Sequence, residues 1–144
     1  MVDSEERQIA SELIAKYLSL EITNDELSDD FPRDKRDPAL EAIWWNLWLH
    51  YSDTHSHKAE RKHQLSPEAK ELFERGAAFL RTDLEYKWPP YKWIGFEYAL
   101  WRLLGLGQRL EQKFDVFKSH GDFEVWPFIR REDYTKFAST RANR

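Results

Sequence analysis

The sequence contains no cysteine, which excludes disulfide bonds, thiolate metal ligands and a cysteine nucleophile. No apolar run reaches the roughly 18 residues of a membrane span. The acidic N-terminus lacks the basic region, apolar run and small-residue cleavage site of a signal peptide. From these absences we expect a soluble, cytoplasmic protein with no membrane partner.

Glycine is scarce as well, with five residues in a chain of 144. The stretch "GLG" at 105–107 lacks the remainder of a dinucleotide-binding or P-loop fingerprint. The sequence also has neither the G-x-S-x-G elbow of serine hydrolases nor the HExxH motif of zinc proteases. Because no catalytic signature is present, the sequence favours a non-enzymatic function.

The chain does contain enough apolar material for a core. Hydrophobic residues make up 41% of it and aromatic residues 15%, a composition too apolar for intrinsic disorder. A chain of this length forms one domain that buries roughly two-thirds of its unfolded surface without metal or disulfide bonds. We therefore predict a single helical domain over residues 1–144, with a frayed tail at 138–144.

Capping residues predict where three helices and one single helical turn begin. The expected caps are Asp3, Thr23, Asp37 and Ser66, the last two followed by proline. Apolar residues at helical spacing extend the first helix over about 4–19 and the helix after Ser66 to about 82. The helix after Asp37 has the strongest apolar pattern, whereas Thr23 caps a single turn.

The remaining sequence carries weaker patterns. Apolar spacing predicts a helix over 94–104 and a further helical piece through about 117. Residues 123–128, "FEVWPF", fit a short extended or β segment, and Asp133 is a candidate cap for a last short helix. The predicted fold class is mainly α, an irregular single-domain bundle of four to five helices.

The stretch "HYSDTHSHKAERKH", residues 50–63, holds four of the five histidines. If the helix that begins after Asp37 continues through it, then His50, Asp53 and His57 lie within about 60° on one helical face. Two imidazoles and a carboxylate suit zinc or another divalent transition metal. This arrangement predicts a metal-dependent hydrolase as the alternative function.

The opposite interpretation is that this helix ends near Ser52. Residues that hydrogen-bond their own backbone are frequent in "SDTHSH" and disfavour helix interiors. The shared face would then be lost, and the stretch would be a polar connection to the next helix. The helix dipole would favour a charged His50. Even if the helix did continue, His55 and His63 would point away from the face shared by His50, Asp53 and His57. We favour this interpretation, with no cofactor.

Two surfaces are candidates for partner binding. An acidic cluster can attract a basic protein, and tryptophan and tyrosine are enriched at interface hot spots. The candidate residues are Asp25, Glu26, Asp29, Asp30, Trp88 and Tyr91. The formal net charge of -4 disfavours nucleic acid as a partner. We expect a protein-binding or inhibitory module, which resembles bacterial immunity proteins in general character but not in any motif.

Overall fold

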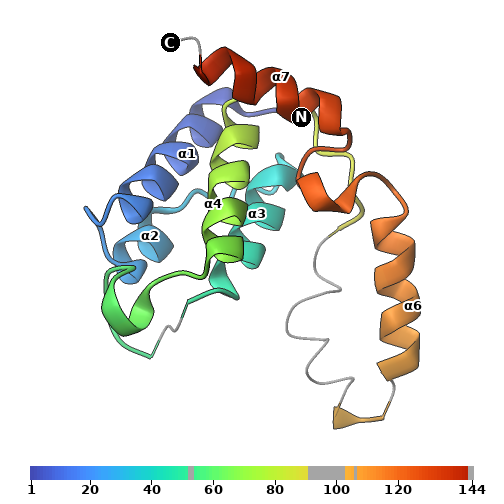
Figure 1. Ribbon diagram of the computed structural model, residues 1–144, viewed down its shortest axis with the longest axis horizontal. Helices are drawn as coiled ribbons and strands as arrows, with labels where there is room; N and C mark the ends of the chain where they lie inside the picture. Colours follow the sequence, from blue (N-terminus) through green and yellow to red (C-terminus); the bar gives the residue numbers. More distant parts are fainter. Residues whose placement is uncertain (52–53, 91–102, 106, 143–144) are drawn as a thin grey trace. The chain divides into compact units, whose positions relative to one another are not determined.

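The computed structural model describes residues 1–51, 54–90, 103–105 and 107–142, and it confirms the mainly helical fold (Figure 1). Those residues form six α-helices and two short 3-10 turns, and they contain no β-strand. The chain divides into two compact units, residues 1–85 and 86–144. No helix among the described residues is both long and apolar enough to cross a lipid bilayer.

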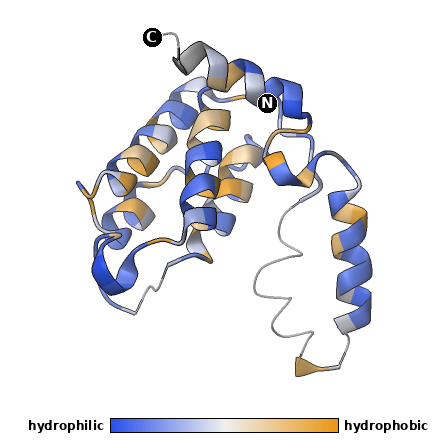
Figure 2. Cartoon of the chain, in the orientation of Figure 1, coloured by the Kyte–Doolittle hydropathy of each residue, from blue (hydrophilic) through white to orange (hydrophobic). Residues whose placement is uncertain are grey.

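The N-terminal unit is built from four helices. They are α1 (Ser4–Leu18), α2 (Asn24–Asp30), α3 (Pro38–Trp48) and α4 (Pro67–Leu80). α1 packs against α4 and α2, and α3 also packs against α4 (Figure 1). Polar and apolar residues are interspersed along α1 and α4, as expected of amphipathic helices (Figure 2). The largest apolar side chains of this core that are fully buried are Ile14, Tyr17, Leu27, Leu40, Ile43, Leu47, Phe73 and Phe79.

All four predicted helix caps are confirmed. The capping side chain accepts a hydrogen bond from an amide in the first turn of its helix at Asp3, Thr23, Asp37 and Ser66. Glu26 completes a capping box by accepting a hydrogen bond from the Thr23 amide at 2.8 Å. These helix starts are predictable because the hydrogen bonds that fix them join residues only two or three positions apart.

A buried ion pair that no sequence pattern indicated connects three parts of this unit. Arg7 on α1 and Asp37 at the start of α3 are almost fully excluded from solvent, and Nε of Arg7 lies 2.6 Å from Oδ2 of Asp37. Nη1 of Arg7 also donates to the carbonyl oxygens of Thr82 and Leu84, at 3.0 and 2.8 Å. The guanidinium therefore ties the segment after α4 to the starts of α1 and α3.

The C-terminal unit contains α6 (Gly107–Lys118), the 3-10 turn η3 (Phe123–Val125) and α7 (Arg131–Ala142). The buried Trp88 indole stacks on Phe117, with ring centroids 5.1 Å apart. Its Nε1 donates to the carbonyl oxygen of Pro127 at 3.1 Å. Trp88 therefore belongs to the core of this unit, in a segment that is non-helical up to residue 90.

Several expectations for the C-terminal third need correction. Residues 123–128 do not form a strand, because the amides of Val125 and Trp126 bond within the turn, to the carbonyls of Asp122 and Phe123. Helix α7 begins at Arg131, so Asp133 lies in its first turn and is not its cap. The helix continues to Ala142, and fraying of the tail at 138–144 stays a prediction. Most of the helix predicted over 94–104 lies outside the described residues.

Candidate metal centre

The helix whose end the sequence left open stops before the histidine-rich stretch. α3 ends at Trp48, and the chain then turns at 49–50. The continuous helical face proposed for His50, Asp53 and His57 therefore does not form. Asp53 itself lies outside the described residues. The set of three stays a prediction, without the helix that was expected to align it.

His50 lies beside the aromatic ring of Phe73, with ring centroids 6.5 Å apart in an edge-on arrangement. Partial desolvation of the imidazole lowers the pKa of His50. This direction is opposite to the one expected from the dipole of α3, which favours the charged ring. Desolvation is the cause of this lowered pKa.

The loop between α3 and α4 brings three other histidines together. His55, His57 and His63 each offer one ring nitrogen, and these nitrogens all lie within 4.8 Å of one another. Nε2 of His55 is 3.0 Å from Nε2 of His63. The rings of His57 and His63 are stacked, with centroids 3.8 Å apart. We call these three residues the histidine cluster.

Asn24, the first residue of α2, holds the loop in this conformation. Its Oδ1 accepts a hydrogen bond from the His57 amide at 2.8 Å, and its Nδ2 donates to the His55 carbonyl at 3.3 Å. The backbone amide of Asn24 also donates to the His57 carbonyl at 2.9 Å. Because Asn24 is 1% exposed, these three bonds attach the loop firmly to the buried start of α2.

A tight turn then returns the chain to the cluster. Arg61 has a φ of 54°, in the left-handed region that side chains other than glycine rarely adopt. It opens the 3-10 turn η1 (Arg61–His63), in which the His63 amide donates to the Glu60 carbonyl at 3.0 Å. This turn places the ring of His63 against the rings of His55 and His57.

The hydrogen bonds of His57 determine which of its ring nitrogens is a free acceptor. Nδ1 lies 3.0 Å from the carbonyl oxygen of His55. A carbonyl oxygen only accepts, so Nδ1 carries the proton and Nε2 of the neutral ring carries a lone pair. That Nε2 atom is buried and has no hydrogen-bond partner. Metal-binding histidines typically show this arrangement, with the second nitrogen donating to a carbonyl group.

The other two rings are also suited to metal binding. Nδ1 of His55 lies 3.0 Å from the hydroxyl oxygen of Thr54, which leaves Nε2 directed at His63. Partial desolvation, followed by repulsion from His57, His55 and Lys62, lowers the pKa of His63. A lowered pKa favours the neutral imidazole, which is the form that binds metal.

The spacing of the cluster is close to that of a zinc site. With Zn–N distances of about 2.0–2.1 Å, two ligand atoms of a tetrahedral site lie about 3.3 Å apart. The 3.0 Å separation between His55 and His63 is near this value, while the widest separation reaches 4.8 Å. A shared ion would therefore require the rings to reorient until the widest separation closes to about 3.3 Å.

A hollow of about 480 Å³ borders the cluster. Its lining is mainly basic and consists of His57, Lys58, Glu60, Arg61, Lys62 and His63. None of the acidic residues of α2 lines it. A ligand that bound to the cluster from this side would meet the positive charges of Lys58, Arg61 and Lys62 and the single carboxylate of Glu60.

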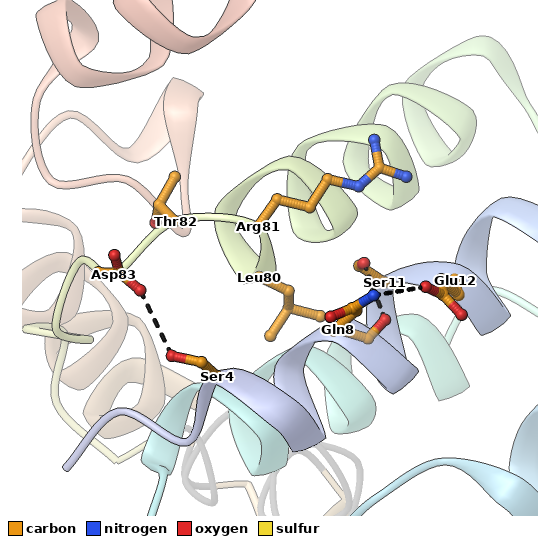
Figure 3. Close-up of a pocket in the computed structure, with 8 residues that line it drawn as sticks. All are labelled: Ser4, Gln8, Ser11, Glu12, Leu80, Arg81, Thr82 and Asp83. Carbon is orange, nitrogen blue, oxygen red and sulfur yellow. Dashed lines mark hydrogen bonds between the residues drawn. The ribbon is translucent and has the colours of Figure 1, made fainter.

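A second hollow, of about 440 Å³, lies between α1 and the end of α4 (Figure 3). Its polar groups largely bond to one another: Nε2 of Gln8 donates to Glu12 at 3.0 Å, and the Ser4 hydroxyl donates to Asp83 at 3.4 Å. None of the side chains lining it carries a buried polar atom without a partner. This hollow therefore lacks the free acceptor found at the histidine cluster.

The residues predicted to bind a partner are distributed differently. The acidic residues Asp25, Glu26, Asp29 and Asp30 all lie on α2 and are exposed. Trp88 is buried in the C-terminal unit and is not available as a surface anchor. Tyr91 lies outside the described residues. Binding of a basic protein to the acidic face of α2 stays a prediction.

Sequence reasoning missed His55 and His63 as a pair with His57 because it considered them on a continuous helix. The short connection between these two helices could have indicated the cluster. If α3 ends near Trp48 and the next helix begins after the Ser66 cap, all three histidines lie in one loop. Comparison with known proteins assigns no family, since no protein-family model, curated protein or solved structure matches the chain.

Proposed function

We propose that the protein binds a divalent transition-metal ion, with zinc as the best fit, through the rings of His55, His57 and His63. One observation carries the proposal. Nε2 of His57 is a buried acceptor without a hydrogen-bond partner, and it belongs to a cluster whose ligand nitrogens lie within 4.8 Å of one another. A buried polar atom left unpaired costs about 1–3 kcal/mol, and a metal ion would satisfy this one.

The chemistry of the ligands favours zinc. Imidazole nitrogen suits zinc, copper, iron and nickel, whereas magnesium and calcium prefer oxygen ligands. Zinc has no geometric preference from its d electrons, so its ligands need not adopt the square-planar arrangement typical of copper(II) and nickel(II). A zinc ion with three imidazole ligands and an open position can act as a Lewis acid.

An ordinary polar loop explains these contacts less well. Three imidazoles beside Lys62 would repel one another if they were protonated, and Lys62 already contributes to lowering the pKa of His63. A loop with no ligand would be expected to spread such rings into solvent. Here the structure instead holds His57 at 8% exposure and secures its backbone through Asn24.

The test is a calorimetric zinc titration of the full chain, purified without a histidine tag. The proposal predicts one zinc ion per chain, and we expect His57→Ala to weaken binding at least about tenfold. The matched control is His50→Ala, which removes a histidine of the same region that lies outside the cluster. Circular dichroism of each variant verifies that it is folded.

Two results would contradict the proposal. The first is wild-type protein that takes up no stoichiometric zinc. The second is equal loss of binding in His50→Ala and His57→Ala together with normal binding in His63→Ala, which would favour the set of His50, Asp53 and His57 instead.

A further inference from the structure

The histidine cluster supplies three ligands, whereas tetrahedral zinc takes four. Among the residues that the structure describes, no carboxylate and no fourth histidine joins the group. Glu60 lines the same hollow but does not belong to the group of converging ligand atoms. Three protein ligands with one open position are the arrangement of catalytic zinc sites, where water or substrate takes the fourth place.

The surroundings of that fourth position are strongly basic for an acidic protein. The chain has a formal net charge of -4, yet Lys58, Arg61 and Lys62 line the hollow against Glu60 alone. All three basic side chains are exposed, so they are free to turn towards a ligand. With a divalent ion in the cluster, the hollow would carry a concentrated positive charge.

We propose that a metal ion in the histidine cluster binds a phosphate group as its fourth ligand, supplied by free phosphate or by a small phosphate ester. This inference rests on the proposed metal site. A phosphate oxygen would coordinate the metal, and the remaining oxygens would accept hydrogen bonds from Lys58, Arg61 and Lys62. Arginine presents a planar fork suited to phosphate, and lysine provides a compact point charge.

Charge and size distinguish phosphate from other ligands. A neutral ligand would leave the charge of the basic lining and of the bound metal ion uncompensated. A carboxylate carries a single negative charge, whereas phosphate near neutral pH carries up to two and has more oxygens to share among several donors. The hollow of about 480 Å³ is large enough for a small phosphate ester as well as for the free ion.

The experiment uses the cobalt-loaded full chain, because the visible absorption bands of cobalt(II) respond to a change in its ligands. Inorganic phosphate, phenyl phosphate and acetate are titrated separately against cobalt-loaded and metal-free protein. We expect phosphate and phenyl phosphate to shift the bands with saturation, and acetate to bind about tenfold more weakly. Metal-free protein has no cobalt bands, so its binding is measured by calorimetry, and we expect it to bind none of the three anions. A shift with phosphate alone identifies the free ion as the ligand, and a tighter response to phenyl phosphate identifies an ester.

Paired variants test the role of the basic lining. With the cobalt site saturated in every variant, Lys58→Gln combined with Lys62→Gln should weaken phosphate binding about tenfold. The matched control is Lys16→Gln combined with Lys35→Gln, which changes the net charge equally at exposed positions outside the hollow. Equal phosphate affinity in the two double variants would overturn the inference.

The remaining outcomes separate this inference from the metal site itself. If cobalt binds and phosphate leaves its spectrum unchanged, the inference is wrong and the metal site stands. If the spectrum of Asp53→Asn differs from that of wild type before any anion is added, Asp53 is the fourth ligand and the inference is wrong. If no metal binds, both proposals are wrong.

Discussion

Asn24 shows how a single side chain links the histidine cluster to the helical core. It is 1% exposed, and its amide group bonds to the backbone at both His55 and His57. These contacts span 31 and 33 positions of sequence. No local pattern reports such a distance, which is why the sequence indicated the histidines but not their conformation.

We expect Asn24→Ala to weaken zinc binding about 10–100-fold, as is typical when a residue that supports metal ligands is removed. The change leaves the buried amide of His57 without its acceptor, so we also expect a loss of about 1–3 kcal/mol in stability. Thr23→Ala is the matched control, because it removes the neighbouring cap of α2 at a cost of about 1 kcal/mol without touching the loop. Zinc calorimetry and urea unfolding measure the two effects. Unchanged zinc affinity in Asn24→Ala would show that the hydrogen bonds of Asn24 do not position the metal ligands.

At the scale of elements, local signals predicted the starts of helices better than their ends. The caps at Asp3, Asp37 and Ser66 act within a single turn, so short sequence patterns indicate them. The end of α3 at Trp48 was harder to locate, because apolar residues continue through Leu49 and Tyr51 and mimic a longer helix. Tyr51 lies against Tyr17 from the loop, with ring centroids 5.9 Å apart, and spacing alone does not distinguish packing in a loop from packing in a helix.

The buried ion pair between Arg7 and Asp37 gives a prediction about how the N-terminal helices are held together. Arg7→Met would leave a buried carboxylate without its partner, and we expect a loss of about 3–5 kcal/mol in the free energy of unfolding. Arg36→Met is the control, because its ion pair with Asp34 is exposed and such pairs contribute about 0–1 kcal/mol. Chemical denaturation compares them. Similar losses of unfolding free energy in the two variants would contradict the claim that the buried ion pair stabilises the fold more than the exposed one.

Asp37 also makes stability depend on pH. Burial alone would raise its pKa, but hydrogen bonds from Arg7 and from the amides of Asp3 and Ala39 outweigh burial and leave the pKa below its usual value. The contribution of ionised Asp37 to the free energy of unfolding is therefore complete above its pKa in the unfolded chain, about 3.9. It is lost as the pH falls through the lower pKa that Asp37 has in the folded protein. We expect the stability difference between wild type and Asp37→Asn to shrink below about pH 4. A difference that stays constant from neutral pH down to acid unfolding would contradict this.

For the molecule as a whole, composition and periodicity predicted the mainly helical fold correctly because they report burial, which dominates folding. They predicted little of the candidate site. The histidine cluster depends on the end of α3, on the left-handed turn at Arg61 and on the hydrogen bond between Asn24 and the distant His57 amide. Each of these is a property of the folded chain.

The most direct test of the metal centre is the zinc K-edge X-ray absorption spectrum of the zinc-loaded full chain. The account predicts three imidazole nitrogens at about 2.0–2.1 Å, with the outer-shell scattering typical of histidine rings. It also predicts loss of this signal when His55, His57 and His63 are all changed to alanine. A first shell of oxygen atoms without imidazole scattering, or an unchanged spectrum in the triple variant, would contradict the central claim.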